Sequence, residues 1–167
     1  MKKRRTFIVV AVAALLVTGA AGAVLWLAIH NDDDLPAPET VERFQLSDTA
    51  NGQGELKEIT AQEYNTMVAE QKNFVVVLHM VVCPAEFPIT NSAKQLAHDE
   101  GLRLYSMVED EFAQTDLVRR IKYLPSVAII REGDVVDFLD AEADEDLPYY
   151  KTAAGLKEWL EQWVEIK

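Results

Sequence analysis

The chain of 167 residues carries 16 Lys and Arg against 28 Asp and Glu, which gives a formal net charge of −12. All the acidic residues but only twelve of the basic ones lie beyond residue 30, so this larger part has a formal charge of −16. Such a surface repels nucleic acid and anionic lipid headgroups, and it favours cationic proteins or peptides as partners. It can equally serve solubility alone. The charge therefore excludes a nucleic-acid partner. It is compatible with a cationic partner and with a role in solubility alone.

The first thirty residues differ in composition from the rest. Residues 1–5 form a basic tail, and residues 6–29 contain no charged side chain. A helix of this length reaches roughly 36 Å and crosses a hydrocarbon core about 30 Å thick. We therefore expect one transmembrane helix with a cytoplasmic N-terminus, because basic residues precede it and Asp32, Asp33 and Asp34 follow it. A cleaved signal peptide is the alternative, although its apolar core is typically only about 7 to 15 residues.

The residues beyond this helix are then expected outside the cytoplasm, in a single-pass protein of the cell membrane. Residues 30–55 are acidic, contain Pro36 and Pro38, and predict a stalk and N-terminal extension in which residues 41–46 are compatible with a strand. Residues 56–167 are long enough for one domain with its own core. Since Cys83 is the single cysteine, no disulfide can form within these residues, and packing must stabilise the domain.

Strand and helix patterns alternate along residues 56–167. Thr60 and Glu63 form a capping-box signal for a helix start. Residues 74–80 are a continuous apolar run, which is typical of a strand buried on both faces. Further patterns predict a helix from Ile89 or Thr90 to Gly101, a strand at 102–108, a helix at 111–120, a hairpin of 126–130 with 135–139, and a last helix with Leu156, Trp159, Leu160, Trp163 and Val164 on one face. This order predicts an α/β fold with a central mixed sheet and helices on both faces.

Three short motifs in this order resemble the thioredoxin family, over residues 56–167. Residues 76–83 resemble the strand that runs into its Trp-Cys-Gly-Pro-Cys motif, with Cys83 in the place of the first cysteine. Residues 121–125, I-K-Y-L-P, resemble its I-R-G-I-P segment, which implies that Pro125 is a cis-proline facing the site. Residues 131–136, R-E-G-D-V-V, resemble the turn of its last hairpin. With the membrane anchor, the chain looks most like exported thioredoxin-like proteins of Gram-positive bacteria, including bacteriocin transport accessory proteins.

The chain departs from the family at three positions that carry chemistry. Glu86 replaces the resolving cysteine, so the Cys-x-x-Cys motif is degenerate, while Val82 replaces the tryptophan and Val77 the buried aspartate. Disulfide exchange by a dithiol requires a second thiolate, which Glu86 cannot supply. The resemblance still implies a face that binds extended peptides. Its residues are Cys83, Pro84, Ala85, Glu86, Leu124 and Pro125.

These features favour a redox-inactive accessory module that binds a protein or peptide. The alternative is an enzyme, a monothiol oxidoreductase or isomerase that uses Cys83 alone; a helix N-terminus would stabilise its thiolate, and Glu86 would oppose this. Cys83 can instead pack as a small hydrophobe or link two chains in a disulfide dimer. His79, four residues earlier, is either a base for that thiol or a hydrogen-bonded residue at a strand end.

The remaining motifs predict no metal site and no cofactor. Residues 140–146 contain five acids but lack the glycine of a calcium loop, so they predict a solvated acidic loop. The chain shows no zinc ligand set and no phosphate-binding glycine loop. Tyr149 and Tyr150 are candidates for an interaction face, whereas Trp159 and Trp163 are expected in the core.

Overall fold

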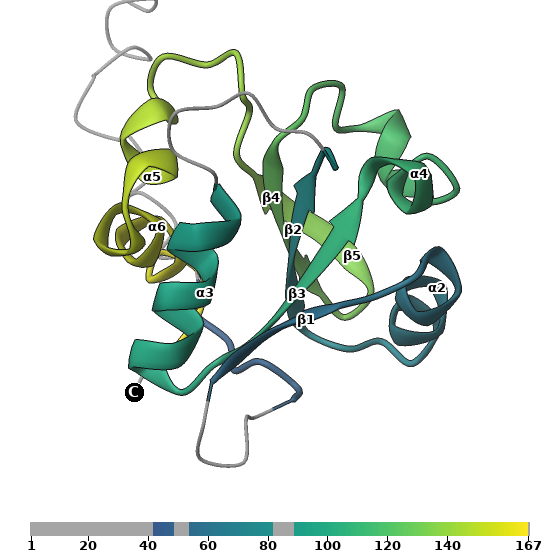
Figure 1. The fold of residues 1–167 in the computed structure, drawn as a ribbon. Helices are drawn as coiled ribbons and strands as arrows, with labels where there is room; N and C mark the ends of the chain where they lie inside the picture. Colours follow the sequence, from purple (N-terminus) through teal and green to yellow (C-terminus); the bar gives the residue numbers. More distant parts are fainter. Residues whose placement is uncertain (1–41, 49–53, 82–88, 167) are drawn as a thin grey trace, which may run out of the picture. The chain divides into compact units, whose positions relative to one another are not determined.

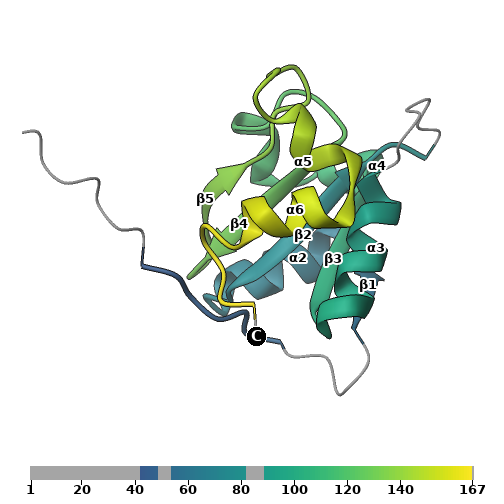
Figure 2. The ribbon, with the colours of Figure 1, turned by 90° about the vertical axis from the view of Figure 1, so that its left-hand side faces the viewer.

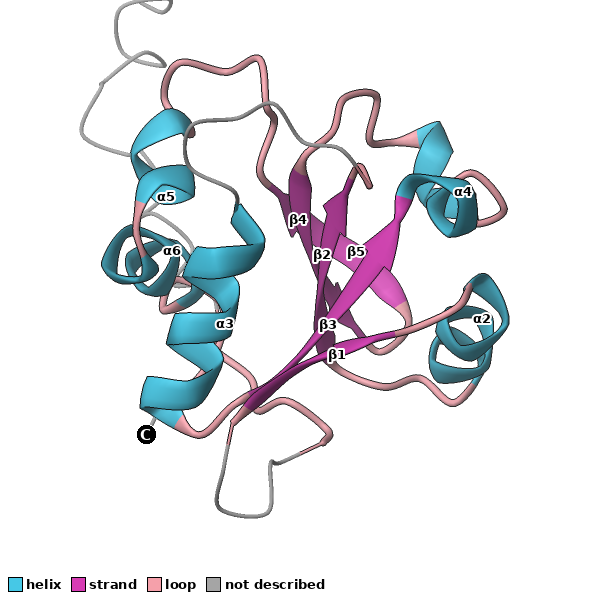
Figure 3. Cartoon of the chain, viewed as in Figure 1, coloured by secondary structure: helices cyan, strands magenta, loops and turns pink. Residues whose placement is uncertain are grey.

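The computed structural model describes residues 42–48, 54–81 and 89–166, all within a compact unit of Val41–Lys167. These residues form a five-stranded sheet with helices on both faces (Figure 1, Figure 3). The strands are β1 (Glu55–Glu58), β2 (Phe74–His79), β3 (Arg103–Val108), β4 (Ser126–Arg131) and β5 (Asp134–Phe138). In the order β1-β3-β2-β4-β5, the first three strands run parallel, and β4 and β5 are antiparallel to their neighbours. The predicted mixed sheet is confirmed.

The strand β2 lies at the centre of the sheet and separates two hydrophobic clusters. Its side chains alternate between the faces, as strand geometry requires. Val75 and Val77 pack in the cluster under α3 and α6, whereas Phe74, Val76 and Leu78 pack in the cluster on the α2 side. All five are at most 2% exposed, which explains why the sequence shows a continuous apolar run here.

The helices form one layer on each face of the sheet. On one side lie α2 (Ala61–Ala69), α4 (Glu109–Phe112) and the 3-10 helix η2 (Asp116–Arg119). On the other side lie α3 (Ile89–Glu100), α5 (Leu147–Lys151) and α6 (Ala153–Leu160), which face the viewer in Figure 2. The sequence did not indicate α5.

The start of α2 confirms the predicted capping box. The Thr60 hydroxyl oxygen accepts a hydrogen bond from the Glu63 amide at 3.2 Å, and the Thr60 amide donates to the Glu63 carboxylate at 2.9 Å. The bond from the Thr60 amide is the main reason that the pKa of Glu63 is lowered, and the neighbouring Lys57 ammonium adds to it. A third contact comes from α4, where the Glu111 carboxylate accepts a hydrogen bond from the Ala61 amide at 2.7 Å. Two of the first amides of α2, those of Ala61 and Glu63, are therefore satisfied by side chains.

Two predicted elements are wrong in detail. The helix expected at 111–120 is split into α4 and η2, because Thr115 is extended (φ −104°, ψ 168°) and its buried hydroxyl donates to the Phe112 carbonyl at 2.8 Å. The strand considered for residues 41–46 is a single bridge between Phe44 and Val164. The end of α3 at Gly101, where φ is +66°, and the β4–β5 hairpin agree with the prediction.

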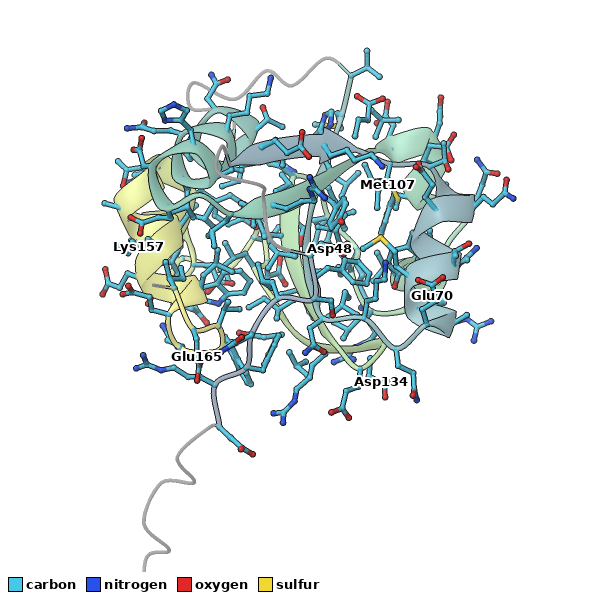
Figure 4. All side chains as sticks on the ribbon, turned by 90° about the horizontal axis from the view of Figure 1, so that it is seen from below. Asp48, Glu70, Met107, Asp134, Lys157 and Glu165 are labelled. Carbon is cyan, nitrogen blue, oxygen red and sulfur yellow. The ribbon has the colours of Figure 1, made fainter. Side chains whose placement is uncertain are left out.

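Residues 42–48, here called the N-terminal brace, pack against the end of the sheet where β2 begins and β4 ends. Phe44 is 7% exposed and belongs to the core. Its amide donates to the Trp163 carbonyl at 2.9 Å, and the guanidinium of Arg131 lies 5.5 Å from the centre of its ring. Further along, the Ser47 amide donates to the Asn73 carbonyl at 2.8 Å. Figure 4 looks onto this end of the sheet and labels Asp48, the last residue of the brace.

A shared carboxylate joins α6 and the following turn to β5. Asp137 Oδ2 accepts hydrogen bonds from the indole nitrogens of Trp159 at 3.1 Å and Trp163 at 2.9 Å. Trp159 is 4% exposed, so its predicted place in the core is confirmed, and Trp163 packs against the same cluster. Tyr150 is also buried, so it is not available for the surface suggested by the sequence.

Several predictions fall on residues that the structure does not describe. Cys83, Pro84, Ala85 and Glu86 lie in the undescribed range 82–88, and the expected transmembrane helix of residues 6–29 also lies outside the described residues. Among the helices of residues 42–48, 54–81 and 89–166, none has the length and apolar character needed to span a membrane.

Candidate functional site

Pro125 directly precedes β4, and a hydroxyl group of α5 lies within hydrogen-bond distance of its carbonyl. The Leu124–Pro125 peptide bond is cis, as the resemblance implied. The hydroxyl of Tyr150 lies 3.2 Å from the Pro125 carbonyl oxygen and 2.9 Å from the Leu139 carbonyl oxygen, so it can donate to either. The Ser126 hydroxyl also donates to the Leu139 carbonyl, at 2.7 Å. Burial raises the pKa of Tyr150 and thereby keeps this hydroxyl protonated as a donor.

A cavity of about 340 Å³ lies beside Pro125. Small-ligand sites typically have volumes of roughly 300 to 1,000 Å³. The lining of this cavity comes from the end of β2, the start of α3 and the residue before β4: His79, Met80, Val81, Ile89, Thr90, Asn91 and Pro125. A second cavity of about 200 Å³ shares His79 and Thr90. It is also lined by Leu56, Glu58, Lys94 and Ser106. The topology therefore brings the carboxyl end of β2 and the cis-proline to one edge of the sheet.

Two large apolar side chains are exposed at this edge. Val81 is 71% exposed and Tyr123 is 45% exposed, whereas most side chains of this kind in the described domain are buried. The backbone between Lys122 and Leu124 makes no hydrogen bond to any other described residue. Amides and carbonyls that have no partner among the described residues, beside apolar side chains, are suited to an added strand.

His79 is the titratable side chain that lines both cavities together. Its Nδ1 lies 3.2 Å from the Met80 carbonyl oxygen. In the neutral ring this contact assigns the proton to Nδ1 and leaves Nε2 as an acceptor. His79 is half-buried, so Nε2 can accept a hydrogen bond from a bound group.

Val77 occupies the place where the family has a buried aspartate, and it is fully buried. It is 0% exposed, packs in the apolar cluster under α3, and pairs in register with Ser106 on β3. This position therefore offers no carboxylate for proton transfer.

The structure brings together some of the predicted site residues and adds others. Leu124 and Pro125 lie at the edge that also contains His79, while the predicted residues of the range 82–88 are not described. Sequence reasoning missed the anchoring role of Tyr150, because two adjacent tyrosines near an acidic loop give no signal that one hydroxyl points inward. It also missed the exposure of Tyr123, although its place two residues before Pro125 was a usable signal.

Comparisons with known proteins define the class of fold. No protein-family model matches the chain, and no curated protein sequence matches it. Among solved structures, it is similar to oxidised thioredoxin from Plasmodium falciparum, with 14% identity and a TM-score of 0.51 over 66% of this chain and 100% of the other. It is also similar to thioredoxin from Malassezia sympodialis, with 14% identity, a TM-score of 0.49, and 66% and 92% of the two chains covered.

The domain therefore has a thioredoxin-like fold, as the sequence predicted. A chloroplastic thioredoxin z gives 20% identity and a TM-score of 0.47, with 65% of this chain and 93% of the other covered. At such identities the likeness concerns the fold, and what the protein does must be argued from its own residues.

Proposed function

We propose that this chain is a membrane-anchored, extracytoplasmic thioredoxin-like protein that binds a protein or peptide and does not carry out dithiol exchange. The observation that supports this most is the Pro125 edge, which we define as residues 79–81, 89–91 and 122–125. It combines a cavity of about 340 Å³, exposed Val81 and Tyr123, and backbone groups without hydrogen bonds to other described residues. An extended peptide would satisfy such backbone groups by strand addition and place alternate side chains in the cavity.

The residues also argue against a dithiol cycle. The 167 residues contain one cysteine, Cys83, and Glu86 stands where the second would release a mixed disulfide. The buried Val77 cannot shuttle a proton. An accessory role in binding is therefore better supported than thioredoxin activity.

The membrane anchor is supported by the sequence of residues 1–29. Four basic residues precede an uncharged segment that is long enough to span a bilayer, and residues 30–55 would link it to the domain. In cells, an anchored protein should stay with membranes after alkaline carbonate washing, and external protease should digest its domain in spheroplasts. Release of a shortened chain into the medium would instead indicate a cleaved signal peptide.

Peptide binding can be tested by changing the exposed side chains of the Pro125 edge. We expect Val81→Ser and Tyr123→Ser in the full-length chain in mild detergent each to weaken binding of a fluorescein-labelled, Val- and Thr-rich decapeptide by about tenfold. The matched control is Leu147→Ser, since Leu147 is 41% exposed but lies outside the Pro125 edge. Equal binding by all three variants, or no binding by the unmodified chain, would contradict the proposal.

The alternative function is monothiol exchange by Cys83, and the position of His79 favours it. An imidazole whose Nε2 is an acceptor lies four residues before Cys83 in the sequence. The pH dependence of Cys83 alkylation, measured beside an insulin-reduction assay, separates the two functions. The enzyme function is supported if the pKa of the Cys83 thiol lies well below about 8.5, if the variant His79→Gln raises this pKa, and if insulin is reduced. Slow alkylation without insulin reduction supports the binding module, and a reducible dimer band would reveal pairing through Cys83.

A further inference from the structure

A cavity of about 400 Å³, here called the α2 cavity, lies between α2 and the strands β1 and β3. Among the described residues, none lines both this cavity and either of the two cavities near Pro125. Its volume falls within the range of roughly 300 to 1,000 Å³ that is typical of small-ligand sites. The peptide-binding function proposed above does not use the α2 cavity, so it is a separate candidate site.

Three buried side chains give the α2 cavity an apolar part. They are Ile59, Met67 from α2 and Tyr105 from β3. The hydroxyl of Tyr105 donates a hydrogen bond to Asp48 Oδ2, and Asp48 also lines the cavity. Burial raises the pKa of Tyr105, so the hydroxyl remains a donor at neutral pH. The cavity therefore combines a surface for an apolar group with a carboxylate held by a buried tyrosine.

The charged residues of the α2 cavity are balanced in number, although the whole chain has a net charge of −12. The cations are Lys57, Lys72 and Arg103, and the carboxylates are those of Asp48, Glu63 and Glu70. Lys57 lies 3.3 Å from Glu63, and Lys72 lies 3.2 Å from Glu70. Figure 4 labels Asp48 and Glu70 of this set. Four of the six charges are thus paired with each other inside the set.

Arg103 keeps one edge of its guanidinium group without a protein partner. Its Nε donates to Glu55 Oε1 at 2.8 Å, and the two residues are in register on β3 and β1. Glu55 is not among the residues that line the cavity. Within residues 42–48, 54–81 and 89–166, the terminal nitrogens Nη1 and Nη2 donate to no other group. This edge matches the two oxygens of a carboxylate.

Asp48 offers an acceptor to the same cavity. Its Oδ2 accepts from Tyr105 and lies 3.8 Å from Lys72 Nζ, while Oδ1 accepts from no residue that the structure describes. Arg103 and Tyr105 are two residues apart on β3, so their side chains share a face of the sheet at a spacing of about 7 Å. The guanidinium edge and the carboxylate that Tyr105 holds therefore serve one cavity.

We propose that the α2 cavity binds a small zwitterion with an apolar side chain, of the size of a free amino acid. The carboxylate of the ligand pairs with the terminal nitrogens of Arg103, its ammonium group donates to Asp48, and its side chain packs on Ile59 and Met67. A ligand with both charges is complementary to this lining, whereas a simple anion or cation faces an equal number of like charges. Hydrogen bonds between charged groups make such recognition selective.

The test compares L-leucine with three analogues that each lack one group. L-Leucinamide has no carboxylate, isocaproate has no ammonium group, and glycine has no apolar side chain. Binding to the full-length chain in mild detergent at neutral pH is measured by isothermal titration calorimetry. We expect each analogue to bind about tenfold more weakly than leucine, because each loses one hydrogen-bonded charge or the apolar contact. No binding of leucine at millimolar concentration, or equal binding of leucine, leucinamide and isocaproate, would overturn the proposal.

Three variants assign the groups of the ligand to residues. Arg103→Gln should weaken leucine binding about tenfold and leave leucinamide binding unchanged. Asp48→Asn should weaken leucine binding by a similar factor and leave isocaproate binding unchanged. Thr66→Trp changes no charge, but Thr66 is an exposed residue of α2 that lines the cavity, so a large ring there should abolish binding.

The matched control is Lys157→Gln, which removes a cation that also pairs with a carboxylate, that of Glu100 at 2.7 Å, but that does not line the α2 cavity. It should bind leucine as the unmodified chain does. If it weakens binding as much as Arg103→Gln, the assigned site is wrong. Arg103→Gln should still bind the decapeptide at the Pro125 edge, so each of the two sites can fail without the other.

Discussion

The two ends of the central sheet differ in how the chain satisfies its backbone groups. Where β2 begins and β4 ends, the N-terminal brace supplies partners: Phe44 exchanges hydrogen bonds with the segment after α6, and Ser47 with Asn73. Where β2 ends and β4 begins, the backbone of residues 122–124 makes no hydrogen bond to another described residue. One end is therefore tied together by contacts with the brace, whereas the other is the end at which we propose that a peptide binds.

Among the changes that compare the two ends, removal of the Phe44 ring should cause the largest loss of stability. Phe44→Ala deletes a buried aromatic side chain from the end of the sheet where the brace packs, here called the closed end. We therefore expect the free energy of unfolding to fall by about 3 kcal/mol. Urea titration of the full-length chain measures the loss. The control is Val81→Ala at the opposite end, beside Pro125, here called the open end. The 71% exposure of Val81 predicts a loss of less than about 0.5 kcal/mol. Similar losses at both ends would contradict the comparison.

Substitution of Asn73 should cause the second-largest loss of stability, because its side chain connects the brace to the β4–β5 turn. Its amide nitrogen donates to the Gln45 carbonyl at 3.1 Å, and its side-chain oxygen accepts from the Glu132 amide at 2.8 Å. Asn73→Ala should cost about 1 to 2 kcal/mol in the same titration. Asn91→Ala, at the open end, is the matched control and should cost almost nothing. The comparison would be weakened if the two changes were equal.

Tyr150→Phe should cost about 1 kcal/mol at neutral pH, since it removes the hydroxyl that donates to the Leu139 or the Pro125 carbonyl. Burial raises the pKa of Tyr150 in the folded state, so its stabilising effect is complete below the ordinary tyrosine pKa of about 10. Above this pH the unfolded chain ionises first and stability falls. Denaturation between about pH 8 and 11.5 should therefore show a shallower alkaline loss in the variant than in the unmodified chain. An unchanged slope would mean that Tyr150 is not buried as described.

Tyr123→Ser should have the smallest effect on stability, below about 0.5 kcal/mol, because the side chain is 45% exposed. Amide hydrogen exchange tests the difference between the two ends directly. The amides of residues 122–124 should exchange rapidly, and those of Phe44 and Ser47 should be protected. A decapeptide that binds by strand addition should slow exchange at residues 122–124 alone. Protection of these amides without any peptide would show that the open end is already closed.

Most of the sheet could be predicted from the sequence because local patterns and burial agree there. The apolar run of β2, the Arg131–Asp134 turn and the Thr60 capping box each depend on a few neighbouring residues. The break between α4 and η2 depends on the hydroxyl of Thr115, which helical periodicity does not register. The brace was missed as a packed segment because its acceptors, near Asn73 and Trp163, are distant in the sequence.

The candidate site was predicted less completely than the fold. The I-K-Y-L-P segment was enough to place Pro125 at the edge, because a short motif fixes a backbone position. The hydroxyl that contacts its carbonyl comes from Tyr150, and the cavity beside it is lined by residues of β2 and α3. Such contacts arise only when the chain is folded, so spacing within one segment cannot reveal them.

The pair of indoles on Asp137 has a spectroscopic consequence. The chain contains three tryptophans, and Trp159 and Trp163 both donate to this one carboxylate between β5 and the C-terminal turn. Their emission should shift when α6 separates from the sheet, and it should stay nearly constant when a peptide occupies the cavity beside Pro125, which neither indole lines. Intrinsic fluorescence should therefore report unfolding and not peptide binding. Binding must be measured with a label on the peptide.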